Sequence, residues 1–254
     1  MSNEDTSRTE PQSPEPQDWR SLSDRLTTAL KPTAPPLAIS FLPRGSAAPA
    51  ARLDQAYPEP NEKGRTGQVP AGCVFWIKGA TSSFATVAAD HANCSVGSFT
   101  HGFLTLEEAA AKDDVCAVLE SGWVDVASVQ GLPRVSEKPE TIVYSPLAQA
   151  ETTPDVVLLR INGFALMSLK DALPGLRIEG KPQCHIIAIA KEQGQVAASV
   201  GCALSRARTG MRPEEMTCAI PGSRLADVIR AVEAAVSLDR AMAGYAAADA
   251  RRFQ

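Results

Sequence analysis

The chain has 254 residues, of which 44 % are hydrophobic and 21 % are charged. This composition is typical of a globular protein, and the length allows one large domain or two small ones. A net charge of -4 argues against nucleic acid as the main partner, and no apolar run approaches the roughly 18 residues of a membrane span. We therefore expect a small-molecule substrate, no nucleic acid and no membrane. The composition allows a homo-oligomer without requiring one.

The first 17 residues are polar, acidic and rich in proline. Such a segment cannot bury enough apolar surface to offset the entropy of ordering, so we predict a disordered tail. It has neither the basic nor the apolar region of a signal peptide, which indicates a cytoplasmic protein. Disulfides are rare in that compartment, and we therefore expect the six cysteines to be free, metal-bound or catalytic.

The order of helices and strands follows from hydrophobic spacing, capping residues and the positions of proline and glycine. The segment 43–70 has no such pattern, and a loop of that length is usually functional or mobile. In chain order we predict a helix at 19–30, a strand at 37–42, a short helix at 72–80, a strand at 82–88, a helix from the Thr105 capping box to about Leu119, strands at 141–147 and 154–161, a helix at 163–173, a hairpin of 184–190 with 195–204, a strand at 216–221 and a helix from Leu225.

These elements mix strands and helices without strict alternation of strand, helix and strand. The pattern favours the α+β class, with a mixed or antiparallel sheet and packed helices in a single domain. We place that domain at 18–240 and a C-terminal helical extension at 241–254.

Two cysteines would face each other in the predicted hairpin. With a loop at 191–194, Cys184 lies opposite Gly201 or, after a small shift, opposite Cys202. Directly opposed residues have Cα atoms roughly 4.5–5.5 Å apart, a spacing that suits two ligands of one metal. Two buried cysteines that act as small hydrophobic residues are the alternative.

Cys94 lies in the segment HANCSVGSFTHGF, residues 91–103, where a helix could begin directly after it. Backbone N–H groups at a helix start lower a thiol pKa and favour the thiolate that a metal ligand or a nucleophile requires. His101 would lie two turns later on the same face, as a ligand, an acid/base group or an ordinary surface histidine. For Cys73, packing beside Trp76 and a ligand role remain equally open.

Four segments together resemble the DUF169 (ArCR) family over about residues 35–235: PPLAISF, HANCSVGSFTHGF, IVYSPLAQAETTPDVVLLRIN and QCHIIAIAKEQGQVAASVGCALSRARTGMRPEEMTCAIP. The family pattern has an HSCP-x-G segment, a PL…PDVV…NP segment, a further cysteine and a GC-x-x-SR…E…IP ending. The chain departs from it at Ser95 and Gly163, where the pattern has proline. By this resemblance the motif residues are Cys94, Cys184 and Cys202, with Cys73 upstream, Asn162 in the NP element and Arg206 in the SR element.

The resemblance and the cysteine pattern lead to one hypothesis for the site. Cys94, Cys184 and Cys202 hold an iron–sulfur cluster such as [4Fe–4S], whose open iron binds a small substrate. Cys73 is a fourth ligand or a redox partner, and His101 moves a proton. The expected chemistry is that of a lyase or a reductive enzyme, an oxidoreductase.

Two residues are assigned to the substrate itself. Arg206 would anchor a substrate carboxylate through its planar guanidinium group, and Asn162 would contact the same molecule. Two rival functions stay open at this point. One is a zinc-stapled binding module without chemistry, and the other is a metal-free enzyme with Cys94 as a nucleophile activated by His91 or His101.

Overall fold

The computed structural model describes residues 17–53 and 72–251. The predicted N-terminal tail, apart from residue 17, and residues 54–70 of the predicted long loop lie outside these ranges. The helices are α1 (Trp19–Leu30), α2 (Gly72–Lys78), α3 (Ser95–Thr100), α4 (Leu106–Ala110), α5 (Asp113–Glu120), α6 (Val126–Gln130), α7 (Gly163–Ala172), α8 (His185–Gln193), α9 (Ala203–Thr209) and α10 (Leu225–Ala250). The strands are β1 (Leu37–Leu42), β2 (Phe84–Thr86), β3 (Thr141–Pro146), β4 (Val156–Ile161), β5 (Arg177–Glu179), β6 (Ala197–Ser199) and β7 (Met216–Pro221).

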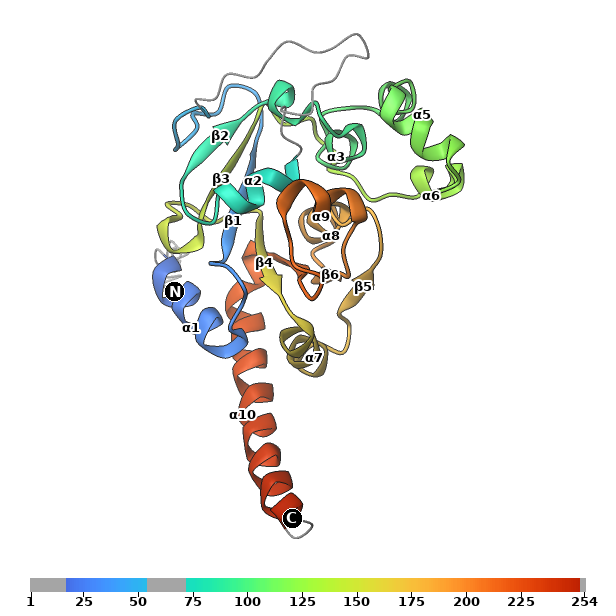
Figure 1. The fold of residues 1–254 in the computed structure, drawn as a ribbon. Coiled ribbons are helices and arrows are strands. Elements are labelled where there is room, and N and C mark those ends of the chain that lie inside the picture. The colour runs from blue at the N-terminus through green and yellow to red at the C-terminus, as the bar shows by residue number, and fades with distance from the viewer. Residues whose placement is uncertain (1–16, 54–71, 252–254) are drawn as a thin grey trace, which may run out of the picture.

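The strands form one mixed sheet in the order β2-β3-β1-β4-β7-β6-β5 (Figure 1). All neighbouring strands run antiparallel except β5 and β6, which are parallel. The four central strands are apolar and largely buried, as expected for strands that are covered on both faces. The predicted α+β class with a mixed sheet and packed helices is therefore confirmed.

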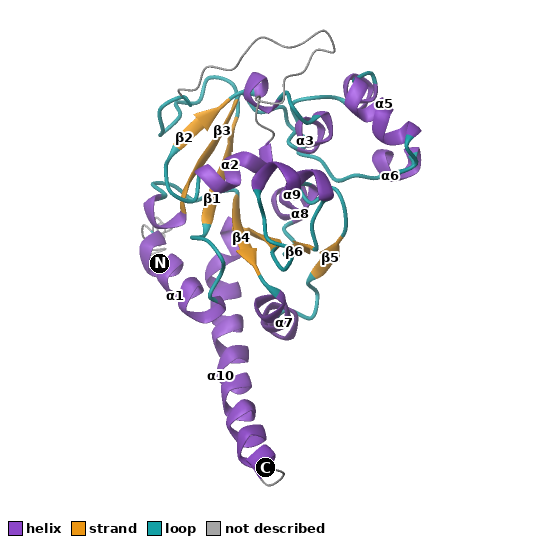
Figure 2. Cartoon of the chain, viewed as in Figure 1, coloured by secondary structure: helices purple, strands orange, loops and turns teal. Residues whose placement is uncertain are grey.

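Helices cover both faces of this sheet, and the alternation of side chains along each strand separates two cores (Figure 2). On β4, Val157 and Leu159 face the core shared with α1, α7 and α10. Val156 and Leu158 face the other core, which contains residues of α2 and α8. Cys94 and Cys184 pack against this second core, so the second face carries the chemistry considered below.

The predicted hairpin between 184–190 and 195–204 is wrong. Residues 185–193 form helix α8, and only Ala197–Ser199 form a strand, which pairs with β5 and β7. Ile186, Ile187, Ala188, Ile189 and Ala190 of α8 are all buried. Because helix and strand give the same continuous apolar run when every face is covered, hydrophobic spacing could not separate them.

The capping box at Thr105 is present, since its hydroxyl accepts from the Glu108 N–H and the Glu108 carboxylate accepts from the Thr105 N–H. The helix that it opens ends at Ala110, and α5 begins at Asp113. Together with α6, these helices lie beside α3 at one side of the molecule, away from the sheet (Figure 1).

The predicted C-terminal extension is continuous with the domain, because α10 runs unbroken from Leu225 to Ala250. Its buried residues end at Val236, and its second half projects from the body (Figure 1). Within the described ranges, no helix combines the length and the apolar character that crossing a membrane requires.

Candidate functional site

Cysteines from four distant parts of the chain line one cavity of about 280 Å³. One lies in the first turn of α2, and the other three directly precede α3, α8 and α9. Burial is the main cause that raises the pKa of the Cys184 thiol, and the charges of the other three thiolates would each raise it further, so this sulfur lies near the other three. Cys116 is exposed on α5 and Cys218 is buried in β7, and neither lines the cavity. The cysteines brought together are Cys73, Cys94, Cys184 and Cys202.

The start of α3 fixes the Cys94 side chain. Cys94 has an extended backbone, and its Sγ accepts a hydrogen bond from the Gly97 N–H at 3.4 Å. The sequence prediction that Cys94 begins a helix is thus confirmed. From the last turn of the same helix, the Thr100 hydroxyl donates to Cys184 Sγ at 3.3 Å. One short helix therefore contacts two of the four sulfurs.

Three of the four thiols are favoured in their protonated form by their surroundings. Burial raises the pKa of Cys94 and Cys184, and it raises the pKa of Cys73 to about 11. The Arg208 guanidinium offsets part of this effect at Cys94, and a hydrogen bond with Ser205 offsets part of it at Cys73. A metal that binds here must therefore displace protons from these thiols.

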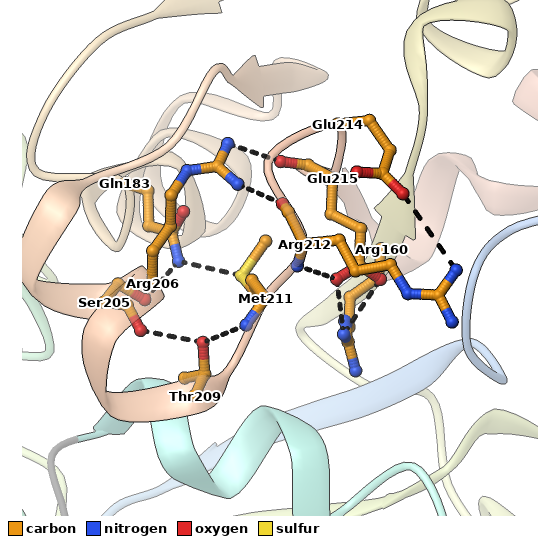
Figure 3. A network of polar contacts seen from close by, with 9 residues as sticks. All are labelled: Arg160, Gln183, Ser205, Arg206, Thr209, Met211, Arg212, Glu214 and Glu215. Carbon is orange, nitrogen blue, oxygen red and sulfur yellow. Dashed lines mark hydrogen bonds and ion pairs between the residues drawn. The ribbon is translucent and has the colours of Figure 1, made fainter.

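Arg206 does not line the cavity. It lies on α9, and its side chain ties this helix to the backbone that precedes and follows it (Figure 3). Its guanidinium donates to the backbone carbonyls of Val200, Arg212 and Glu215. It also packs against Gly201, whose φ of +115° and lack of a side chain permit the contact. In the sequence GCALSR, the glycine and the arginine thus hold the backbone that presents Cys202. The prediction that Arg206 binds a substrate gains no support from this position.

Asn162 lies on the other side of the sheet, where it caps α7. Its Oδ1 accepts from the Ala165 N–H at 3.0 Å, an arrangement that ordinarily stabilises a helix start. Asn162 is not among the residues that line the cavity, so its predicted contact with substrate is likewise unsupported.

His101 lines the cavity and is 1 % exposed. Its Nδ1 lies 2.7 Å from the Gly97 carbonyl and donates to it, which leaves Nε2 as an unprotonated acceptor. Within the described ranges, this Nε2 has no hydrogen-bond partner. Burial lowers the pKa of His101 to about 4, although the bond to Gly97 opposes the shift. At neutral pH the imidazole is therefore uncharged and can accept a proton.

A second buried histidine lies behind the first. The Thr86 hydroxyl donates to the Ile142 carbonyl and so accepts from His91 Nε2, at 3.0 Å. The ring centroids of His91 and His101 are 5.6 Å apart, and burial lowers the pKa of His91 as well. His91 is not a lining residue, so among the two candidate histidines the cavity favours His101.

Alanine at Gly72 is expected to disturb this histidine pair. An added Cβ would lie 3.1 Å from both His101 Cε1 and His91 Nδ1, closer than ordinary van der Waals contact. Because overpacking outweighs the gain in helix propensity, we expect Gly72→Ala to lower the free energy of unfolding by about 1 kcal/mol. Chemical denaturation measures this change. Gly163→Ala is the control, since a Cβ there meets nothing within 4 Å, and equal effects of the two changes would contradict the prediction.

The sequence model of one family, DUF169, described as uncharacterised ArCR, matches residues 25–231. The chain belongs to the DUF169 family. The match contains all four cavity cysteines and confirms the resemblance drawn from the motifs. No curated protein and no solved structure matches the chain.

The DUF169 cavity also contains polar residues that the sequence reasoning missed. Ser205 and Arg208 lie three and six residues after Cys202, on the same side of α9. A helix that begins after Cys202 would place both beside the cysteine, whereas the strand predicted at 195–204 does not. Gln183 precedes Cys184, and its amide nitrogen donates to Ser205 Oγ and contacts Met211 Sδ (Figure 3).

The cysteines of this DUF169 protein do not converge on a single point. Within the described ranges, no three His, Cys, Asp or Glu side chains are arranged to share one metal ion. Polar atoms around the thiols are nevertheless left unpaired. Among the described residues, Trp76 Nε1, Gln183 Oε1 and Tyr144 Oη are buried without hydrogen-bond partners, although buried polar atoms are ordinarily satisfied by protein, water or a bound group. Four thiols beside such atoms fit a bound group larger than one ion.

Proposed function

We propose that this protein is a cytoplasmic iron–sulfur enzyme that acts on a small molecule. The ligands of the cluster are Cys94, Cys184 and Cys202, and the cluster is of the [4Fe–4S] type. The observation that supports this most is the presence of these three thiols, with Cys73, in one cavity. Thiolates are the usual ligands of such clusters, and free cysteines fit a reducing compartment. Cys73 is a fourth ligand or a redox partner.

A cluster and one zinc ion would require different spacings of the four sulfurs. Four sulfurs that bind zinc must each lie about 2.3 Å from the same point. In a cluster each thiolate binds its own iron atom, so the sulfurs stay farther apart. The zinc-stapled module therefore stays the alternative, and metal analysis decides between the two.

The cavity gives each of its residues a part in the proposed reaction. A cluster with three protein ligands supplies one iron that can act as a Lewis acid on a bound oxygen, nitrogen or sulfur. Trp76, Trp123 and Val129 form an apolar part of the wall around that space. His101 Nε2 accepts a proton as the substrate reacts, because it is unprotonated and has no other partner among the described residues. This arrangement suits a lyase or a reductive step.

One observation favours the rival function with Cys94 as a nucleophile. The Gly97 N–H and the Arg208 guanidinium both contact this sulfur and favour its thiolate. Burial nevertheless keeps the pKa of Cys94 above its ordinary value. Without a metal, the thiol would be mostly protonated and a poor nucleophile near pH 7. The cluster therefore remains the better account of the same residues.

Purification without oxygen tests the proposal directly. We expect a brown protein with broad visible absorption that bleaches on reduction, and about four iron and four sulfide per chain, as a [4Fe–4S] cluster requires. Elemental analysis and absorption spectroscopy give both results. Colourless protein with one zinc per chain would support the binding module instead. Colourless, metal-free protein with one rapidly alkylated thiol would support the nucleophile.

A further inference from the structure

The cysteine cavity is lined by an arginine that forms no ion pair with a carboxylate of the described residues. Three charged residues line it, namely Asp114, Lys181 and Arg208. Asp114 accepts from the backbone N–H and the hydroxyl of Ser95, at 2.9 and 2.7 Å. Lys181 is exposed and is held by Trp123, whose carbonyl accepts from it and whose ring centroid lies 4.2 Å away. Within the described ranges, Arg208 forms no ion pair with a carboxylate.

Arg208 is held in place while most of its N–H donors have no partner among the described residues. Its Nη2 donates to the carbonyl of Asn93 at 3.1 Å, which fixes the guanidinium beside Cys94. A further contact reaches the Cys94 sulfur. A guanidinium has five N–H donors in a planar fork, so most of them are left for a ligand. The fork of arginine matches the geometry of a carboxylate.

Two buried polar groups of the cavity also lack partners. Trp76 is 2 % exposed and Gln183 is 1 % exposed, and both line the cavity. Within the described ranges, neither Trp76 Nε1 nor Gln183 Oε1 has a hydrogen-bond partner. Since the Gln183 amide nitrogen is already engaged by Ser205 and Met211, its oxygen remains as an acceptor for a ligand (Figure 3). The Trp76 indole remains as a donor.

The rest of the lining is apolar. Val118, Val129 and Leu132 come from the helical segment that contains α5 and α6, and Leu204 comes from α9. Trp123 adds an aromatic ring to the same wall. A ligand with an apolar body would bury its surface there, whereas a fully polar one would lose its contacts with water without replacement.

We propose that Arg208 binds the carboxylate of a small substrate with an apolar body, and that this carboxylic acid class defines the specificity of the cavity. The inference rests on the proposed enzymatic function only for the reaction that follows binding. Trp76 Nε1 and Gln183 Oε1 contact the polar atoms at the other end of the substrate. Arg208 thereby takes the substrate-anchoring role that the sequence had suggested for Arg206.

Matched pairs of acids and amides test this assignment on the anaerobically prepared holoprotein. The probes are benzoate with benzamide and hexanoate with hexanamide, and calorimetric titration measures their dissociation constants. We expect at least one acid to bind about tenfold or more tightly than its amide, since a hydrogen bond to a charged partner is stronger than a neutral one. In Arg208→Gln this preference should disappear. No preference in the native protein, or an unchanged preference in Arg208→Gln, would overturn the proposal.

Iron and sulfide analysis of the same samples separates this inference from the proposed function. We expect Arg208→Gln to keep the metal content of the native protein, because Arg208 is not a ligand. An Arg208-dependent preference in protein that contains no iron would support the acid site and refute the cluster. A full cluster without the preference for acids would support the cluster and refute the acid site. Arg230→Gln is the control, because Arg230 is exposed on α10 and is not a lining residue. This variant should prefer acids over amides as strongly as the native protein does.

Discussion

Serine in place of Cys184 is expected to remove most of the iron and sulfide from the anaerobically prepared protein. Burial among the other thiols raises the pKa of this group, and it would lie at the centre of the proposed ligand set. A serine hydroxyl is far harder to deprotonate than a thiol and is a poor ligand for iron–sulfur centres. We expect Cys184→Ser, and equally Cys94→Ser and Cys202→Ser, to retain less than about a tenth of the visible absorption. Iron, sulfide and absorbance per chain measure the loss.

Two cysteines outside the cavity provide the controls for this series. Cys116 is exposed, so Cys116→Ser should keep its full cluster. Cys218 is buried in β7, and Cys218→Ala tests whether a change in the core alone releases iron. Full metal content in all three ligand variants would contradict the assignment. Equal loss in Cys116→Ser would show that the assay reports general damage.

Cys73→Ser separates a three-cysteine cluster from a four-cysteine one. Cys73 lies in the first turn of α2 and lines the cavity with the other three, so position alone assigns it either role. A variant that keeps its cluster leaves one iron without a cysteine ligand, as the proposed enzyme needs. A variant that loses it indicates a closed site, which is suited to electron transfer or structure instead.

Residues with strong local signals were predicted correctly from the sequence. The apolar segment at 37–42 and the segment 216–221 are strands, with the boundaries at which proline and turn residues interrupt them. Trp19, Leu22 and Leu26 recur at helical spacing and are buried on α1. In these cases the local pattern and the tertiary environment favour the same structure.

The segment 184–190 shows where such reasoning fails. Residues 185–190 of α8 are all buried, so this part of the sequence has no polar face to reveal a helical period. Cys184 and Cys202 do line the same cavity, as the false hairpin suggested, but they do so from the starts of two helices. The motif resemblance had singled out the same two residues, and both line the cavity although the predicted local structure was wrong.

Arg208 was missed for a related reason. Its relation to the cysteines depends on α9 being a helix, which places it on the side of Cys202 and Ser205. Arg206 carried the motif signal instead, and its partners explain that signal without a ligand. It binds three backbone carbonyls and packs on Gly201, so its place in the motif is explained by its support of α9. A residue type in a motif therefore does not distinguish contact with substrate from support of the backbone.

Glutamine in place of Glu215 is expected to cost about 3 kcal/mol of unfolding free energy at pH 7, the low end of the range for breaking a buried ion pair. Both Glu215 carboxylate oxygens accept from Arg160 at 2.8 Å (Figure 3), and the side chains are 3 % and 17 % exposed. The change leaves the Arg160 charge without its carboxylate. Chemical denaturation of the two proteins gives the difference.

The exposed neighbour Glu214 provides a matched control. Its ion pair with Arg212 spans 4.0 Å between side chains that are 60 % and 77 % exposed. Glu214→Gln should therefore change the unfolding free energy by less than about 0.5 kcal/mol. A comparable loss in both variants would mean that the buried pair has no special role.

The pH dependence of the same difference has a definite sign. Burial alone would raise the pKa of Glu215, but hydrogen bonds from Thr33, the Arg212 N–H and Arg160 overcome it and hold the pKa below 4.5. A carboxylate with a lowered pKa in the folded state stabilises above its unfolded pKa, and that stability is lost as pH falls through the folded value. The difference between native protein and Glu215→Gln should therefore be constant near neutrality and shrink below about pH 4.5, as linkage requires. A difference that grows on acidification would contradict this.

This network also bears on the cysteine cavity, because the backbone of Glu215 accepts from Arg206, which holds α9. The same helix presents Cys202 at its start and Arg208 in its last turn. If Glu215→Gln loosens the loop between α9 and β7, the Cys202 thiol should become more accessible while the native fold persists. Alkylation of the metal-free protein, followed by mass spectrometry, should then label Cys202 faster in Glu215→Gln than in Glu214→Gln. Equal rates would mean that the network stabilises the fold without positioning the site.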